Sequence, residues 1–258
     1  MTNNWPPFDM HAHVDINTRS EDLLELRAVI FAATRSLAES RAAVLRQPQD
    51  LLTVWGVGTH PAVKTALETF DQSEFADLVT KAAFVAEVGL DAKVKARLPL
   101  QQDVLAQMLC ILQSQPRLTS LHSYGATNEV VELLEQHPID GVILHWWLGD
   151  AQTTAAALDL GAYFSVNPAN LKHIDVLATV PLDRLLPETD HPSGDRFGKP
   201  PRVPGNVSRV EQEIAKLHGL SPTVARQHLW SNLKALTASV NVSRLLPERV
   251  AAVIAAAS

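Results

Sequence analysis

The 258-residue sequence contains a single cysteine, so the chain cannot form an internal disulfide. That residue, Cys110, lies in VLAQMLCILQ, whose apolar spacing predicts a buried helix position in the core rather than a nucleophile. Long apolar runs are also lacking, and none approaches the roughly 20 residues of a membrane helix. The N-terminal MTNNWPPF has neither the basic region nor the apolar core of a secretory signal. These absences predict a cytoplasmic protein with no membrane partner.

A strong excess of either charge is lacking as well. The formal net charge is -6 and the pI is about 5.9. These values argue against a broad basic face for nucleic acid, although they are compatible with a local basic patch beside a metal site. Hydrophobic residues make up 46% of the chain, which is enough to fill a large core. Because no linker or low-complexity segment divides the sequence, we expect one domain over residues 1–258.

Short apolar, β-branched runs alternate with amphipathic stretches along most of the chain, a pattern typical of parallel βα units. The predicted strands are 6–10, 28–33, 51–57, 83–88, 118–123, 141–146, 162–166 and 183–188. The predicted helices include 35–46, 72–82, 99–113, 128–136, 151–160, 208–219 and 247–258. Eight alternations favour a (β/α)8 TIM barrel over a doubly wound sheet. Pro187 is unexpected in the eighth strand, because a closed barrel has no edge at which its missing N–H is harmless; it could mark a bulge.

Two histidines stand one residue apart in FDMHAHVD, residues 8–15. In an extended chain Asp9, His11 and His13 would all point to one side of the strand. Such histidines are often satisfied by backbone or carboxylate hydrogen bonds. The alternative is a pair of metal ligands, because neutral imidazole is a common ligand of divalent ions. That interpretation requires further ligands elsewhere in the chain.

Residue types that bind metals recur where other predicted strands end. The carboxyl ends of barrel strands meet at one rim, and active sites lie there. An unpaired polar group in an apolar strand is costly, so their joint occurrence favours a shared metal site. The residues are His11, His13, His60, Glu87, His122, His145 and Asp190.

Six motifs, FDMHAHVD, GVGTHP, AEVGLD, LHSYGA, LHWWLG and PLDRLLPETDHP, occur in this order. The sequence thereby resembles the TatD family of metal-dependent hydrolases, within the wider amidohydrolase-like barrels. The resemblance extends from about residue 8 to about residue 235, where GNVSRVEQEIAKLHGLSP and SNLKAL resemble the family's closing helices. It implies a hydrolase that holds one or two divalent ions, of zinc, manganese or magnesium.

Specific roles follow from this resemblance. Glu87 would bridge two ions and, with Asp190, act in catalysis, and Asp190 would accept the proton of the attacking water. Glu188 shares a strand face with Asp190, so it either supports the ligands or forms a buried salt bridge. The implied metal ligands are His11, His13 and Asp190 on one ion, His122 and His145 on the other, and Glu87 between them.

The family is described chiefly through deoxyribonucleases, so the resemblance implies a DNA or other phosphodiester substrate, in particular the 3′ end of single-stranded DNA. His60 resembles a position near the substrate, or else it stabilises a turn with Pro61. Trp146 or Trp147 could stack on a base or pack in the core. The loop SGDRFGKPPRVPGNVSR offers cations that either bind phosphate or form a solvated surface, namely Arg196, Lys199, Arg202 and Arg209.

Two positions depart from the family pattern. Tyr124 stands where arginine is common, and Ala62 stands where a second histidine is common after GTHP. Loss of a guanidinium removes a bidentate phosphate partner, so the nuclease substrate is less well supported than the metal site. Two alternatives therefore remain: a hydrolase of the same fold acting on a small ester or amide, and a subunit of a larger complex whose metal site is structural or regulatory. In the latter, Trp146, Trp147 and the C-terminal helix would contact a protein partner.

Overall fold

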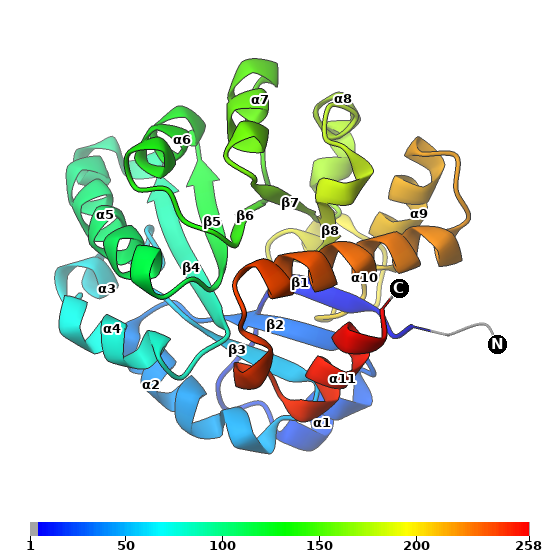
Figure 1. The fold of residues 1–258 in the computed structure, drawn as a ribbon, viewed down its shortest axis with the longest axis horizontal. Coiled ribbons are helices and arrows are strands. Elements are labelled where there is room, and N and C mark those ends of the chain that lie inside the picture. Colours follow the sequence, from blue (N-terminus) through cyan, green and yellow to red (C-terminus); the bar gives the residue numbers. More distant parts are fainter. Residues whose placement is uncertain (1–4, 258) are drawn as a thin grey trace.

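Eight parallel strands form one sheet in the order β1 to β8, and helices surround it (Figure 1). The computed structural model describes residues 5–257, without the side chains of residues 94–96, 174 and 197, so residues 1–4 and 258 of the predicted domain lie outside the described residues. The arrangement confirms the predicted (β/α)8 barrel. The strands are β1 (Phe8–His13), β2 (Val29–Ala33), β3 (Thr53–Val57), β4 (Phe84–Asp91), β5 (Leu118–Tyr124), β6 (Val142–His145), β7 (Tyr163–Val166) and β8 (Leu185–Pro187).

Side-chain caps begin several of the helices. Ser36, Asp71 and Asp150 each accept a backbone N–H from the first turn of the helix that follows. Three helices of four to six residues, α1, α3 and α8, were not predicted, because so short a segment does not display a 3.6-residue period. The helices are α1 (Ser20–Glu25), α2 (Leu37–Arg46), α3 (Lys64–Glu68), α4 (Gln72–Val79), α5 (Leu98–Ser114), α6 (Thr127–Gln136), α7 (Ala151–Asp159), α8 (Ile174–Leu177), α9 (Ser208–Leu217), α10 (Pro222–Ser239) and α11 (Glu248–Ala256).

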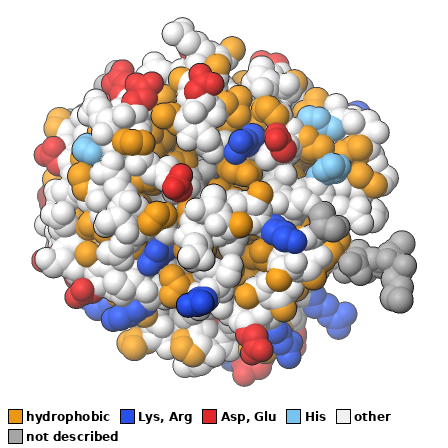
Figure 2. Space-filling view, viewed as in Figure 1, with side chains coloured by type: hydrophobic (Ala, Val, Ile, Leu, Met, Phe, Trp, Pro, Cys, Tyr) orange, Lys and Arg blue, Asp and Glu red, His pale blue; other side chains and the backbone are white. Residues whose placement is uncertain are grey.

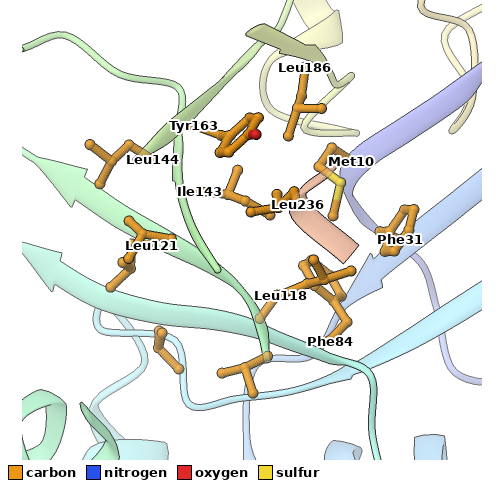
Figure 3. Close-up of a cluster of buried hydrophobic side chains, with 14 of the residues drawn as sticks. Met10, Phe31, Phe84, Leu118, Leu121, Ile143, Leu144, Tyr163, Leu186 and Leu236 are labelled. Carbon is orange, nitrogen blue, oxygen red and sulfur yellow. The ribbon is translucent and has the colours of Figure 1, made fainter. Parts of the chain in front are cut away.

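The barrel interior is filled with large apolar side chains from many strands (Figure 3). Met10, Phe31 and Phe84 are fully buried there, and Leu236 of α10 joins them. Helix α10 crosses the amino-terminal end of the barrel, where Trp230 packs on Phe8 with 4.6 Å between ring centroids. This packing leaves the opposite, carboxyl-terminal rim as the place for polar groups.

Strands β1 and β8 are joined by a side chain as well as by main-chain bonds. Asp9 is fully buried and accepts the backbone N–H groups of Thr189 and Gly205, each at 2.8 Å, and the Thr189 hydroxyl at 2.6 Å. The prediction that Asp9 faces the same way as His11 and His13 was wrong. The register of β1 against β2 shifts between Asp9 and Ala12, and this bulge interrupts the alternation on which the prediction relied.

The position of Pro187 is explained by this junction. The N–H of Glu188 donates to Val166 of β7 at 2.8 Å, so the preceding nitrogen, that of Pro187, points toward β1. On that side the junction uses Asp9 and the main chain of residues 189–191, including His13 N–H to His191 O at 2.8 Å. The missing N–H of Pro187 therefore removes no hydrogen bond from a strand ladder.

The prediction that Cys110 is a core residue was wrong, because its side chain is exposed. The buried positions of α5 include Leu105, Met108, Leu109 and Leu112, which follow a spacing of three and four residues. Cys110 is one residue off this stripe and therefore lies on the solvent side of the helix.

The outer surface does not present a broad basic face on the side that carries α10. Figure 2 shows Lys and Arg interspersed with Asp and Glu over this side of the described chain, in keeping with the acidic composition. Within residues 5–257, none of the helices combines the length and the apolar character needed to cross a membrane.

Candidate metal centre

The structure brings the six predicted metal ligands together at the carboxyl-terminal rim of the barrel. His13 and His145 end their strands, Asp190 follows β8, and His11, Glu87 and His122 lie in the carboxyl-terminal parts of β1, β4 and β5. All six are largely buried. Three overlapping groups of side chains could hold a metal ion, with one ligand atom from each residue and all of these atoms within 4.8 Å of one another. The groups are His11, His145 and Asp190; His11, His13 and Glu87; and His60, Glu87 and His122.

Glu87 occupies the centre of the cluster, and its two oxygens face different histidines. Oε2 lies 3.0 Å from His13 Nε2 and 3.6 Å from His11 Nε2. Oε1 lies 2.6 Å from His122 Nδ1 and 2.9 Å from His145 Nε2. A carboxylate with imidazoles on both sides could contribute an oxygen to a cation on either side.

Asp190 approaches the cluster from β8. Its Oδ1 lies 3.8 Å from His13 Nε2, and its backbone N–H donates to the carbonyl of His11 at 2.9 Å. The backbone at Asp190 has φ of 43°, in the left-handed region that is costly for residues other than glycine. Unfavourable conformations of this kind concentrate at functional sites, where the surrounding structure maintains them.

Several buried polar atoms of the cluster have no hydrogen-bond partner within the described chain. They include His11 Nε2 and Glu87 Oε2, which lie 3.6 Å apart. Leaving such an atom buried and unsatisfied costs about 1–3 kcal/mol. Ser120 Oγ contacts the other ring nitrogen of His11, Nδ1, at 2.7 Å and orients the ring. A divalent cation between these atoms would satisfy them, so the residues fit a metal.

The two carboxyl groups have opposite proton affinities. Burial acts to raise the pKa of Glu87, but the imidazoles of His60, His145 and His122 outweigh it and hold that pKa well below its usual value. Burial raises the pKa of Asp190 well above its usual value. The environments of Glu87 and Asp190 therefore shift the two pKa values in opposite directions, and carboxyl pairs of this kind suit acid–base chemistry.

His60 lies at the same rim, with Nε2 3.3 Å from Glu87 Oε2. Its Nδ1 accepts the backbone N–H of Ala62 at 3.0 Å, so the neutral ring carries its proton on Nε2. Burial lowers the pKa of His60 to about 4, which keeps the ring neutral. His60 lines the cleft and is arranged as a hydrogen-bond donor toward Glu87, while its other ring nitrogen accepts a bond within the turn that contains Pro61.

Glu188 supports the site from behind. Its buried carboxylate accepts the hydroxyl of Ser165, the side-chain amide of Asn167 at 2.9 Å and the backbone N–H of Trp146 at 3.1 Å. Its Oε1 is 3.8 Å from His145 Nδ1. The carboxylate thus fixes the segment that follows β6, which agrees better with a supporting role than with an isolated salt bridge.

Sequence reasoning missed Asp91. This residue ends β4, and its Oδ2 lies 3.3 Å from His122 Nε2, on the side of the ring away from Glu87. A carboxylate in this position orients an imidazole and raises its basicity. Asp91 belongs to the AEVGLD motif, so the motif could have identified it, although its pairing with His122 depends on the fold.

A cleft of about 320 Å³ opens over the cluster. Of the four loop cations predicted to bind substrate, Arg196 lines this cleft. Lys199 and Arg209 line a different pocket, and Arg202 donates to the carbonyl of Gly198 at 3.3 Å. Lys93, which was not predicted, also lines the cleft.

The two tryptophans after His145 have different environments. Trp147 is buried, packs against Phe164 and donates to Thr154 at 2.9 Å. Its burial agrees with the core-packing alternative for this residue. Trp146 lines the cleft and is half-buried.

The barrel and its cluster of imidazoles and carboxylates define the class of metal-dependent hydrolase barrels. The sequence model of the family described as TatD related DNase matches residues 8–238, so the chain belongs to this family. The metal-dependent hydrolase YcfH of Escherichia coli strain K12 is 30% identical over 208 residues, 74% of this chain and 76% of YcfH.

Further relatives agree with this assignment. Deoxyribonuclease TATDN3 of Homo sapiens is 24% identical over 145 residues, 53% of each chain. The crystal structure of YJJV, a TatD homolog from Escherichia coli K12, is similar with a TM-score of 0.77 at 21% identity, over 89% of this chain and 96% of YJJV. This structural likeness supports the barrel fold.

Proposed function

We propose that the protein is a divalent-metal-dependent phosphodiesterase that releases nucleotides from the 3′ end of single-stranded DNA. The main support is the position of Glu87 between two sets of imidazoles, beneath a cleft that also contains Lys93 and Arg196. Cations beside a two-sided ligand cluster suit a phosphate diester, which is negatively charged. The name of the human relative, a deoxyribonuclease, makes DNA the first substrate to test.

The ligand geometry suggests how ions of zinc, manganese or magnesium would be held. When bound, such ions would lower the pKa of water and offset the charge of the phosphoryl oxygens. Glu87 would contribute one oxygen to each side. The remaining ligands would be His11, His13 and Asp190 on one side, and His122 and His145 on the other, as the distances to the two Glu87 oxygens suggest.

The chain's own residues would manage the protons of the reaction. Water forms a new bond to phosphorus while the bond to the O3′ of the preceding nucleotide breaks, leaving a 3′-hydroxyl and a 5′-mononucleotide. Asp190 would take the proton of the attacking water, because its carboxylate lies at the rim of the cleft within 3.8 Å of His13. His60 would donate its Nε2–H hydrogen bond to the leaving O3′, which would take its proton from Asp190 through solvent, and Arg196 would bind the phosphate.

Metal content and nucleotide release together test this proposal. The chain is stripped with a chelator, reloaded with Mn²⁺, Mg²⁺ or Zn²⁺, and incubated with single-stranded DNA labelled at its 3′ or 5′ end. We expect wild type to release the 3′ label first. Asp190→Asn should lower the rate by about 100-fold or more, and the exposed Asp159→Asn on α7 should leave it unchanged.

Two outcomes would contradict the proposal. Release of neither label with any of the three ions would exclude a deoxyribonuclease, and turnover of a carboxylic ester or amide panel would then support the small-substrate alternative. That alternative has one observation in its favour, because Tyr124 stands at the cleft without the charge of an arginine. Equal rates for wild type and Asp190→Asn would exclude Asp190 as the proton acceptor.

A further inference from the structure

One wall of the cleft is apolar, although the cleft lies over a polar cluster. Tyr124, Trp146 and Leu148 line it together with the ligands. Tyr124 is 56% exposed and Leu148 is 42% exposed. Large apolar side chains left in contact with water beside a ligand cluster point to a part of the substrate that would cover them.

This wall is tied to the ligands by the local chain. Tyr124 is two residues beyond His122 on β5, so both side chains leave the strand on the same face. Trp146 directly follows His145, which ends β6. The rings of His122 and His145 approach each other to 3.2 Å, so the two segments lie side by side at the rim.

The conformation of Trp146 is held in place by the protein. Its φ of 42° lies in the left-handed region, which is unfavourable for a bulky side chain. The buried carboxylate of Glu188 accepts its backbone N–H at 3.1 Å. The main chain that carries the ring is therefore fixed before a substrate arrives, which reduces the ordering cost of binding.

We propose that Tyr124, supported by Trp146 and Leu148, forms a subsite for the base of the nucleotide being released. The subsite deepens the proposed phosphodiesterase function and rests on it. Bases stack on aromatic side chains with little sequence preference, because every base presents a π-face. Lys93 and Arg196 line the same cleft and would bind the phosphate of that nucleotide. A cleft of about 320 Å³ is at the small end of ligand pockets, which suits one nucleotide rather than a longer stretch of chain.

Two single strands that differ in one group test this inference. Both have the same sequence, but in one of them the 3′-terminal unit is a tetrahydrofuran that lacks the base and keeps the same phosphodiester. With the manganese-loaded enzyme, wild type should remove the complete nucleotide with a kcat/KM about tenfold higher than the abasic unit. Tyr124→Ala should reduce this ratio to near one, whereas Tyr124→Phe should preserve it because the ring remains.

A matched control and two distinguishable failures complete the test. Leu45→Ala, at an exposed apolar residue of α2, should leave both rates unchanged. A wild-type ratio near one, or equal slowing of both strands in Tyr124→Ala, would overturn the subsite while the phosphodiesterase function stands. Cleavage of neither strand would instead overturn the proposed function and, with it, the subsite.

Discussion

Asp9 provides a direct test of how this barrel closes. Its carboxylate accepts three buried backbone N–H groups, those of Thr189 and Gly205 at 2.8 Å and that of His11 at 3.3 Å, and one hydroxyl. In Asp9→Ala the two closest N–H groups, those of Thr189 and Gly205, lose their acceptor while they remain buried. An unsatisfied buried donor costs about 1–3 kcal/mol, so the unfolding free energy should fall by about 2–6 kcal/mol. Because a whole domain is stable by only about 5–15 kcal/mol, this is a large fraction.

A graded pair of variants strengthens the argument. In Asp9→Asn one oxygen remains as an acceptor, but the new side-chain NH2 group replaces the other oxygen and faces a hydrogen-bond donor. The loss of unfolding free energy should therefore be about half that of Asp9→Ala. Urea unfolding followed by tryptophan fluorescence measures both, with chelator-treated protein so that metal binding does not contribute. The exposed Asp77→Ala of α4 should lie within about 0.5 kcal/mol of wild type.

The outcome that would refute this reasoning is also simple. If Asp9→Ala unfolds within about 0.5 kcal/mol of wild type, the carboxylate does not hold β1 to β8, and the donors find other acceptors. If Asp9→Asn is as unstable as Asp9→Ala, the remaining amide oxygen does not stabilise the junction. The negative charge of Asp9 would then contribute more to the free energy of unfolding than the number of acceptor atoms.

Three further predictions concern the site and the surface. Ser120→Ala should weaken metal affinity by about 10–100-fold in a chelator competition, because His11 loses the partner that orients it, and unchanged affinity would show that the ring is held otherwise. Arg196→Ala should raise the KM for single-stranded DNA by about tenfold, because Arg196 lines the cleft. Lys199→Ala, outside the cleft, should change the KM by less than about twofold. Equal effects of the two substitutions would place both cations on the substrate path. Cys110 should react with a thiol reagent in the folded protein without loss of activity, and a protected thiol would contradict its exposed position.

Much of the architecture is determined by local patterns that the sequence displays. Apolar runs alternating with amphipathic segments specify a strand followed by a helix, and the carboxyl ends of parallel strands must meet at one rim. Residues such as Glu87 and His145 could therefore be assigned to a common site without knowledge of any distance between them. Helices α1, α3 and α8 escaped prediction because they are too short for a periodic signal.

Other properties depend on contacts between residues far apart in the chain. Asp9 receives its hydrogen bonds from residues 180 and 196 positions away, and the bulge in β1 turns it from the histidines. The path of the loop after β8 places Arg196 in the cleft and Lys199 outside it, a separation of three residues that composition does not reveal. The sequence alone thus determined the barrel and the candidate ligands, because the alternation of strands and helices and the type of each side chain are local properties. Tertiary structure decided which side chains face the cleft and which groups bond to one another, because hydrogen bonds and burial arise only when distant segments pack together.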